Sequence, residues 1–193
     1  QCFTDSYQGE VLARYVANEL GAKTVGVVFN TSDDYSSGVK DAFVEEAKAI
    51  GIEIVGEEGY GGQDTDFKPQ LTKMVSSNPD VLLIPDYYKN VALIASQARE
   101  VGLNSIFVGP DGWDGVLSSI DDSNKEAVEG AYFSNHFSVK DTKENVSNFV
   151  SKYKDEYSEE PTAFSALGYD TVYMLKQAIE EVGELDQAKV NEA

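Results

Sequence analysis

Three short segments of the chain bring carboxylates and aromatic rings together. These segments are residues 30–37, 86–90 and 110–115, and their notable side chains are Asp33, Asp34, Tyr35, Asp86, Tyr87, Tyr88, Asp111, Trp113 and Asp114. A cleft lined by tyrosine rings and carboxylates suits a small ligand with an apolar body and a positively charged group. The alternative is chance, because a chain with 11 tyrosines and 34 acidic residues carries such segments without any function.

Each of these segments follows a predicted strand. Residues 23–30, 80–85 and 105–109 are short apolar runs typical of strands buried on both faces, and further strands are predicted at 52–56 and 130–134. Helical patterns separate them, at residues 8–20, 38–50, 66–77, 89–101, 143–157 and 162–182. This alternation predicts an α/β fold with a parallel sheet, in which the strands beginning near Thr24, Val81 and Ser105 are neighbours. Ligands of such sheets bind outside the carboxyl ends of the strands, where the three segments begin.

The composition excludes several classes of partner. The chain has 193 residues, and its 15 basic and 34 acidic residues give a formal net charge of −19. A nucleic acid or an anionic membrane surface needs clustered Lys and Arg, so we expect neither as a partner. No apolar run reaches the length of about 18 residues that indicates a membrane-spanning helix, so we expect no direct membrane insertion of this segment.

The residues that usually hold metals are scarce. Cys2 is the single cysteine and His136 the single histidine, which excludes an internal disulfide framework and the usual His-rich zinc sites. No acidic loop has the spacing of an EF-hand calcium loop. We therefore predict no metal and no cofactor, and we interpret Cys2 as a small buried residue rather than a lipid-anchored one.

Enzymatic motifs are equally scarce. The sequence contains neither a Gly-x-Ser-x-Gly nucleophile elbow nor the glycine-rich loops that bind phosphates. Two carboxylates could serve a glycosidase, but with 34 acidic residues such pairs are expected by chance. We therefore predict a binding protein and not an enzyme.

A series of short motifs, taken in order, resembles a known family. The motifs are TDSYQG at 4–9, GVVFNTSDDYSSG at 26–38, DTDF at 64–67, PDVLLIP at 79–85, QAREVG at 97–102, GPDGW at 109–113 and AFSALGYD at 163–170. In this order they resemble the periplasmic or lipoprotein substrate-binding proteins of branched-chain amino acid ABC transporters, the leucine/isoleucine/valine-binding type. The resemblance covers nearly the whole chain.

The resemblance implies a type I periplasmic binding protein fold, with two α/β lobes joined by hinge segments. Residues 1–134 would form the second, Rossmann-like lobe. Residues 135–193 would be helices that return to the first lobe, whose N-terminal part would be absent. Such helices would have lost part of the surface they normally cover, so they would pack on the present lobe or pair with another copy.

Two tyrosines are assigned to the ligand by this resemblance. Tyr35 stands where the family has a tyrosine that packs on the bound amino acid, although Ser36 replaces the glycine that follows it there. Tyr87 matches the family tyrosine after the next strand, and Tyr88 is the alternative. Both tyrosines could instead be partly buried loop residues.

The resemblance also assigns a carboxylate to the ligand. Asp111 stands at a position that is commonly glutamate in the family, where the carboxylate takes the ligand's ammonium group; alternatively it is a turn residue between Pro110 and Gly112. Asp5 and Phe164 are implied near the cleft and the hinge. We expect Trp113 to pack at the rim of the cleft.

The implied function is the capture of an amino acid or related zwitterion between two lobes, followed by delivery to a membrane permease. The implied location is extracytoplasmic, either periplasmic or as a cell-surface lipoprotein of a Gram-positive organism. The alternative is the ligand-sensing domain of a receptor or regulator that has the same fold and takes no part in transport.

Overall fold

The protein is described by a computed structural model that covers residues 2–193. It contains two compact units. Phe3–Asn135 form the sheet unit, and His136–Ala193 together with Cys2 form the helical unit. The assignment of residues 1–134 and 135–193 to two different lobes stays a prediction.

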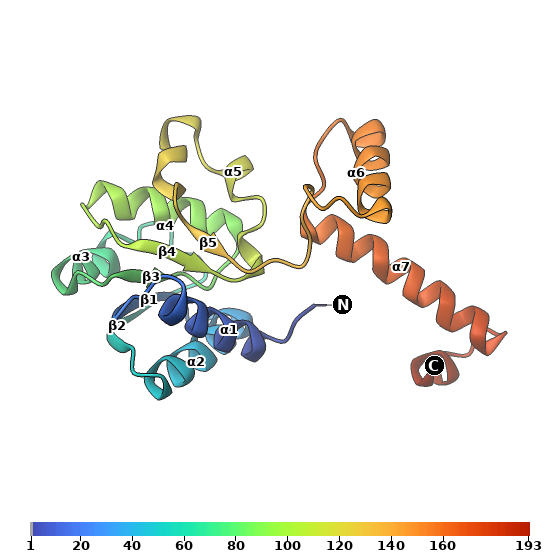
Figure 1. Ribbon diagram of the computed structural model, residues 1–193, viewed down its shortest axis with the longest axis horizontal. Coiled ribbons are helices and arrows are strands. Elements are labelled where there is room, and N and C mark those ends of the chain that lie inside the picture. Colours follow the sequence, from blue (N-terminus) through green and yellow to red (C-terminus); the bar gives the residue numbers. More distant parts are fainter. Residues whose placement is uncertain (1) are drawn as a thin grey trace. The chain divides into compact units, whose positions relative to one another are not determined.

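The sheet unit is built on five parallel strands. They are β1 (Thr24–Asn30), β2 (Glu53–Tyr60), β3 (Val81–Leu83), β4 (Ile106–Gly109) and β5 (Tyr132–Phe133). Their order in the sheet is β2-β1-β3-β4-β5, and all neighbours are parallel (Figure 1). The predicted α/β fold is therefore confirmed, as is the adjacency of β1, β3 and β4.

Helices cover both faces of this sheet. The helices α1 (Asp5–Asn18) and α2 (Asp34–Ala49) pack on one face, while α3 (Lys68–Ser77), α4 (Tyr88–Glu100), the short α5 (Val116–Ser119) and the 3₁₀ segment η2 (Asp122–Val128) pack on the other. Successive strand residues alternate between the two cores, since Val27 and Leu83 face α1 and α2 whereas Val28 and Leu82 face α3 and α4. Burial on both faces explains why these strands are continuously apolar in the sequence.

Two helices begin one turn earlier than the sequence pattern predicts. The predicted starts at residues 8 and 38 follow the apolar periodicity, but α1 begins at Asp5 and α2 at Asp34. The side chains of Thr4 and Asp33 cap these helices by accepting hydrogen bonds from backbone N–H groups of the first turn, over 3.3 Å and 2.8 Å. A polar, capped first turn extends a helix beyond its apolar stripe.

The packing of α1 on α2 depends on Gly9. A Cβ atom at Gly9 would lie 2.5 Å from the carbonyl oxygen of Val39 and 2.7 Å from the amide nitrogen of Phe43. Only a residue without a side chain permits this approach of α1 to the backbone of α2. The neighbouring residue Gln8 is thereby held over the sheet.

The helical unit has little core of its own. It contains α6 (Glu144–Tyr157), α7 (Ala163–Val182) and α8 (Gln187–Glu192), of which α8 was not predicted. Ala163 is the single buried residue of α6 and α7, and several large side chains of α7 are exposed, namely Tyr169, Val172, Tyr173, Met174 and Leu175. This agrees with helices that lack part of the surface they cover; what covers them stays a prediction.

Two further findings concern the predictions from composition. Cys2 is exposed, so its interpretation as a buried residue is wrong; it precedes the cap of α1 and belongs to no helix or strand. Across residues 2–193, no helix combines the length and the apolar character that crossing a bilayer requires.

The close approach at Gly9 generates a stability prediction. Gly9→Ala should lower the free energy of unfolding by about 1–3 kcal/mol, because the added methyl group overlaps the backbone of α2. The measurement is urea unfolding followed by the fluorescence of Trp113, the single tryptophan, which is buried in the sheet unit.

The matched control is Gly38→Ala in α2. A Cβ at Gly38 has its nearest neighbour at 3.4 Å, an ordinary contact. This substitution should therefore stabilise the unit by about 0.5–1 kcal/mol, the usual gain of alanine over glycine inside a helix. Equal effects of the two substitutions would contradict the packing argument.

Candidate functional site

The candidate site lies between two neighbouring strands whose following helices pack on opposite faces of the sheet. The strands β1 and β3 are neighbours, but the helices that follow them, α2 and α4, pack on opposite faces. The loops after these strands therefore diverge and leave a crevice at the carboxyl edge of the sheet. Tyr35 at the start of α2 and Tyr87 at the start of α4 stack across it, with ring centroids 5.0 Å apart and an interplanar angle of 28°.

Asp111 is held beside this pair of rings. It begins the 3₁₀ turn η1 (Asp111–Trp113) after β4, and 7% of its surface is exposed. Its Oδ1 accepts a hydrogen bond of 2.6 Å from the hydroxyl of Tyr35 and one of 2.9 Å from Nε2 of Gln8. The hydroxyl of Tyr35 in turn accepts from the N–H of Gly112 over 2.9 Å. Burial and the neighbouring Asp111 carboxylate raise the pKa of Tyr35 far above its ordinary value, so the phenol stays a donor.

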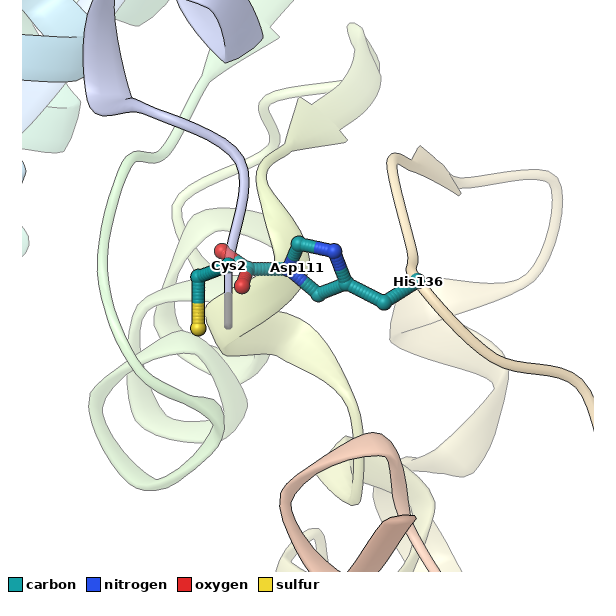
Figure 2. A group of neighbouring side chains, drawn as sticks. All are labelled: Cys2, Asp111 and His136. Atoms are coloured by element: carbon teal, nitrogen blue, oxygen red, sulfur yellow. The ribbon is translucent and has the colours of Figure 1, made fainter. Parts of the chain in front are cut away.

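Figure 2 shows Asp111 on this turn. The other two side chains drawn there, Cys2 and His136, belong to the helical unit. Trp113, at the end of the turn, is buried and donates its Nε1–H to the carbonyl of Ile84 over 2.7 Å. The prediction that Trp113 is a packing residue is therefore confirmed.

A second carboxylate, that of Asp86, holds the segment of backbone that carries Tyr87. Asp86 is 1% exposed and accepts hydrogen bonds from the hydroxyl of Tyr60, from Nδ2 of Asn90 at 3.0 Å and from the N–H of Tyr87 at 2.6 Å. Burial, followed by the charge of Asp86, raises the pKa of Tyr60 far above its ordinary value. With three donors around it, Asp86 holds the backbone from which the ring of Tyr87 projects.

Burial and carboxylate charges raise the pKa values of two residues of the crevice, Tyr87 and Asp5. Burial raises the pKa of Tyr87, and four carboxylates raise it further, those of Asp33, Asp111, Asp5 and Asp86. Burial also raises the pKa of Asp5, with the charges of Asp111 and Asp33 adding to the effect. A site in this field favours a cationic group. Since 41% of Tyr87 is exposed, its ring is open to contact with a ligand.

Four of the five predicted ligand residues gather here. Tyr35, Tyr87 and Asp111 are joined by stacking and hydrogen bonds, and Asp5 by its electrostatic coupling to Asp111. Phe164 lies at the start of α7 in the helical unit, so its place near the cleft stays a prediction. The roles of all five residues as ligand contacts also stay predictions.

The sequence analysis missed two residues of the site. Gln8 reaches Asp111 over 103 positions in the chain, and Tyr60 reaches Asp86 from the end of a strand whose length was underestimated. Gln8 does lie in the TDSYQG motif, which was a signal of its importance without indicating its partner. As built, the site can hold a positive group against Asp111 while the stacked rings cover an apolar body.

Comparison with known proteins matches residues 2–193 to the family described as periplasmic binding protein. The leucine-, isoleucine-, valine-, threonine- and alanine-binding protein of Pseudomonas aeruginosa is 25% identical over 189 residues, which cover 98% of this chain and 50% of that protein. The crystal structure of a leucine-binding protein, LivK, from Thermotoga maritima superposes with a TM-score of 0.90 and 36% identity, covering 99% of this chain and 54% of that one.

A further solved structure carries a ligand. The branched-chain amino acid transporter substrate-binding protein LivJ from Streptococcus pneumoniae, in complex with isoleucine, superposes with a TM-score of 0.83 and 30% identity, covering 98% of this chain and 53% of that one. The resemblance that the motifs predict is thereby confirmed. The chain spans about half the length of the curated relatives it matches.

The electrostatic coupling in the crevice generates a pKa prediction. Asp111→Asn should lower the pKa of Asp5 towards the ordinary carboxyl value, because the substitution removes a neighbouring negative charge. An NMR titration of the Asp5 carboxyl carbon in the 193-residue chain measures this. Asp121→Asn, at an exposed position of the same unit, is the control and should leave the pKa of Asp5 unchanged.

The raised pKa of Asp5 also predicts how the stability of the folded chain depends on pH. The pKa of Asp5 is raised on folding, so the folded state binds this proton more tightly than the unfolded chain does. The contribution of Asp5 to stability therefore falls as the pH rises from the ordinary carboxyl range through the raised value. Asp111→Asn should reduce this decline. An unchanged pKa of Asp5 in that variant would contradict the electrostatic coupling between Asp5 and Asp111.

Proposed function

Since the chain belongs to the periplasmic binding protein family, as the match over residues 2–193 shows, we propose that it is the second lobe and part of the first lobe of an extracytoplasmic solute-binding protein. The ligand is an amino acid of the branched-chain or aliphatic type, captured between the two lobes. The observation that carries this proposal is the Asp111 carboxylate, held beside two stacked tyrosine rings at a place where four carboxylates raise the pKa of Tyr87.

The ammonium group of the amino acid is the part that this lobe recognises. The Asp111 carboxylate accepts hydrogen bonds from the hydroxyl of Tyr35 and the amide of Gln8. An ammonium group would meet this carboxylate in a charge-assisted hydrogen bond. Tyr35 and Tyr87 then lie against the carbon atoms beside the ammonium group. An aliphatic side chain suits these rings because it has no polar group to desolvate.

The carboxylate of the amino acid is held elsewhere. The field that attracts an ammonium group repels a carboxylate, so a zwitterion needs a second set of contacts outside the crevice of the sheet unit. In a two-lobed protein the other lobe supplies them, and the ligand favours the closed state because contacts to both lobes form only there. Phe164, at the start of α7, is proposed to lie near the hinge of this motion.

Delivery to the permease of an ABC transporter is the proposed outcome of closure. It is supported by the similarity to LivJ, a branched-chain amino acid transporter substrate-binding protein. Binding without catalysis is proposed because the similar proteins reported above are binding proteins. An extracytoplasmic location follows from the same assignment to the periplasmic binding protein family.

The role of Asp111 can be tested in the full-length protein. Asp111→Asn keeps the shape of the side chain but leaves the ligand's ammonium group buried without its counter-ion, which typically costs about 2–5 kcal/mol. At about 1.4 kcal/mol per factor of ten, the affinity for leucine, isoleucine or valine should fall roughly 30- to several-thousand-fold. Isothermal titration calorimetry measures this loss.

Asp121→Asn is the control for net charge and should change the affinity little, since Asp121 is exposed. Equal, small effects of both substitutions would demote Asp111 to a turn residue and would point to a ligand without a positive group.

The need for two lobes can be tested with the 193-residue chain. We expect calorimetry with leucine, isoleucine and valine to detect weak binding or none, because a ligand on a single lobe stays half exposed and lacks the contacts for its carboxylate. Sub-micromolar binding by this chain as a monomer would contradict the two-lobe argument. Sub-micromolar binding that depends on protein concentration would show instead that self-association rebuilds the cleft.

A further inference from the structure

Gln8 is a buried polar residue whose amide nitrogen and amide oxygen both make hydrogen bonds. It lies in the first turns of α1, and 2% of it is exposed. Its Nε2 donates to Oδ1 of Asp111 over 2.9 Å, while its Oε1 accepts from the N–H of Asp111 over 3.1 Å and from the hydroxyl of Ser134 over 2.9 Å. A single side chain therefore contacts both the backbone and the carboxylate of Asp111.

The amide of Gln8 has one workable orientation. A flipped amide would aim its NH₂ group at the N–H of Asp111, placing two donors against each other and leaving Oε1 against a carboxylate oxygen. Gly9, the next residue, allows α1 to pack closely against the backbone of α2, which fixes the helix that carries Gln8. The amide thus acts as a rigid two-point clamp on Asp111.

The chemistry of this clamp suits a carboxylate that must keep its charge. A lysine or arginine at position 8 would also hold Asp111, but it would neutralise the carboxylate and compete with a cationic ligand. An acid at position 8 would repel it. A glutamine orients the carboxylate through a neutral donor, as the hydroxyl of Tyr35 does from α2, and adds no positive charge that would compete with a cationic ligand.

The same amide links Asp111 to the end of the sheet. Ser134 directly follows β5, and its N–H donates to the carbonyl of Gly109, the last residue of β4, over 3.1 Å. Gln8 and Gly109 therefore fasten Ser134 from two sides. Asn135 is the last residue of the sheet unit, so the chain leaves the unit one residue after this anchor point.

We infer that Gln8 is the positioning residue of the ligand site, which orients the Asp111 carboxylate towards the ligand and ties it to Ser134 at the exit of the sheet unit. The inference rests on the proposed function, because it assigns to Gln8 an effect on affinity that passes through Asp111. Gln8 does not itself touch the ligand.

A double-mutant cycle in the full-length protein tests this. Gln8→Met keeps the length of the side chain and removes its hydrogen bonds; we expect leucine affinity to fall about ten- to a hundredfold, the usual effect of a hydrogen bond to a charged group. In the Asp111→Asn background the same change should weaken affinity less than about twofold. If Gln8 affects affinity only by orienting the Asp111 carboxylate, its loss has little effect once that carboxylate is gone. Equal factors in both backgrounds would overturn the inference.

A matched control separates positioning from general loosening of the unit. Gln70→Met in α3 is the same substitution at another glutamine of the sheet unit, whose amide donates to the carbonyl of Gly59 over 3.2 Å and not to Asp111. It should leave leucine affinity within about twofold of the unsubstituted protein, as expected for an independent site. If Gln8→Met fails to fold, Gln8→Asn serves instead, since it keeps an amide but withdraws it by one methylene group.

A second measurement is independent of any ligand. In the 193-residue chain, amide hydrogen exchange at Asp111 should accelerate at least about tenfold in Gln8→Met relative to the amide of Val108, because the Asp111 N–H loses its acceptor. Unchanged exchange at Asp111 in Gln8→Met would contradict the inference that Gln8 holds Asp111 in place. Faster exchange combined with no loss of leucine affinity in Asp111→Asn would leave the clamp intact and show that the proposed function is wrong.

Discussion

A carboxylate held by hydrogen bonds at the edge of a parallel sheet is the constraint on which this structure depends. Removing Asp111 from water is unfavourable unless donors replace the lost hydration. The hydroxyl of Tyr35 from α2 and the amide of Gln8 from α1 are two such donors. They fix the carboxylate beside the stacked rings of Tyr35 and Tyr87. The proposed function assigns the positively charged group of the ligand to this carboxylate.

Asp86 shows a different role for a buried aspartate at the same edge of the sheet. It lies one strand away from Asp111 and accepts hydrogen bonds from the hydroxyl of Tyr60, the amide of Asn90 and the N–H of Tyr87. These bonds hold the loop that carries Tyr87. Asp86 therefore shapes the crevice, whereas Asp111 is the carboxylate that the proposed function assigns to the ligand.

Much of this arrangement could be predicted from the sequence because it depends on local patterns. Continuous apolar runs revealed β1, β3 and β4, and the rule for parallel sheets brought Tyr35, Tyr87 and Asp111 to one edge. The rest depends on contacts between distant positions. The partners of Gln8 are 103 and 126 residues away, so no local pattern could identify them. The early starts of α1 and α2 were missed because capped polar turns carry no apolar periodicity.

The helical unit illustrates a limit of a different kind. The helices α6 and α7 were predicted correctly from their apolar stripes, yet large apolar side chains of α7 remain exposed, among them Val172, Tyr173 and Met174. An apolar stripe predicts that a helix packs against something, but it does not show where that surface comes from. On the proposed function the crevice of the sheet unit has the complementary property, since a negative field attracts one end of a zwitterion and repels the other. Both features would then have one physical explanation, which is that each needs a surface that a complete first lobe would supply.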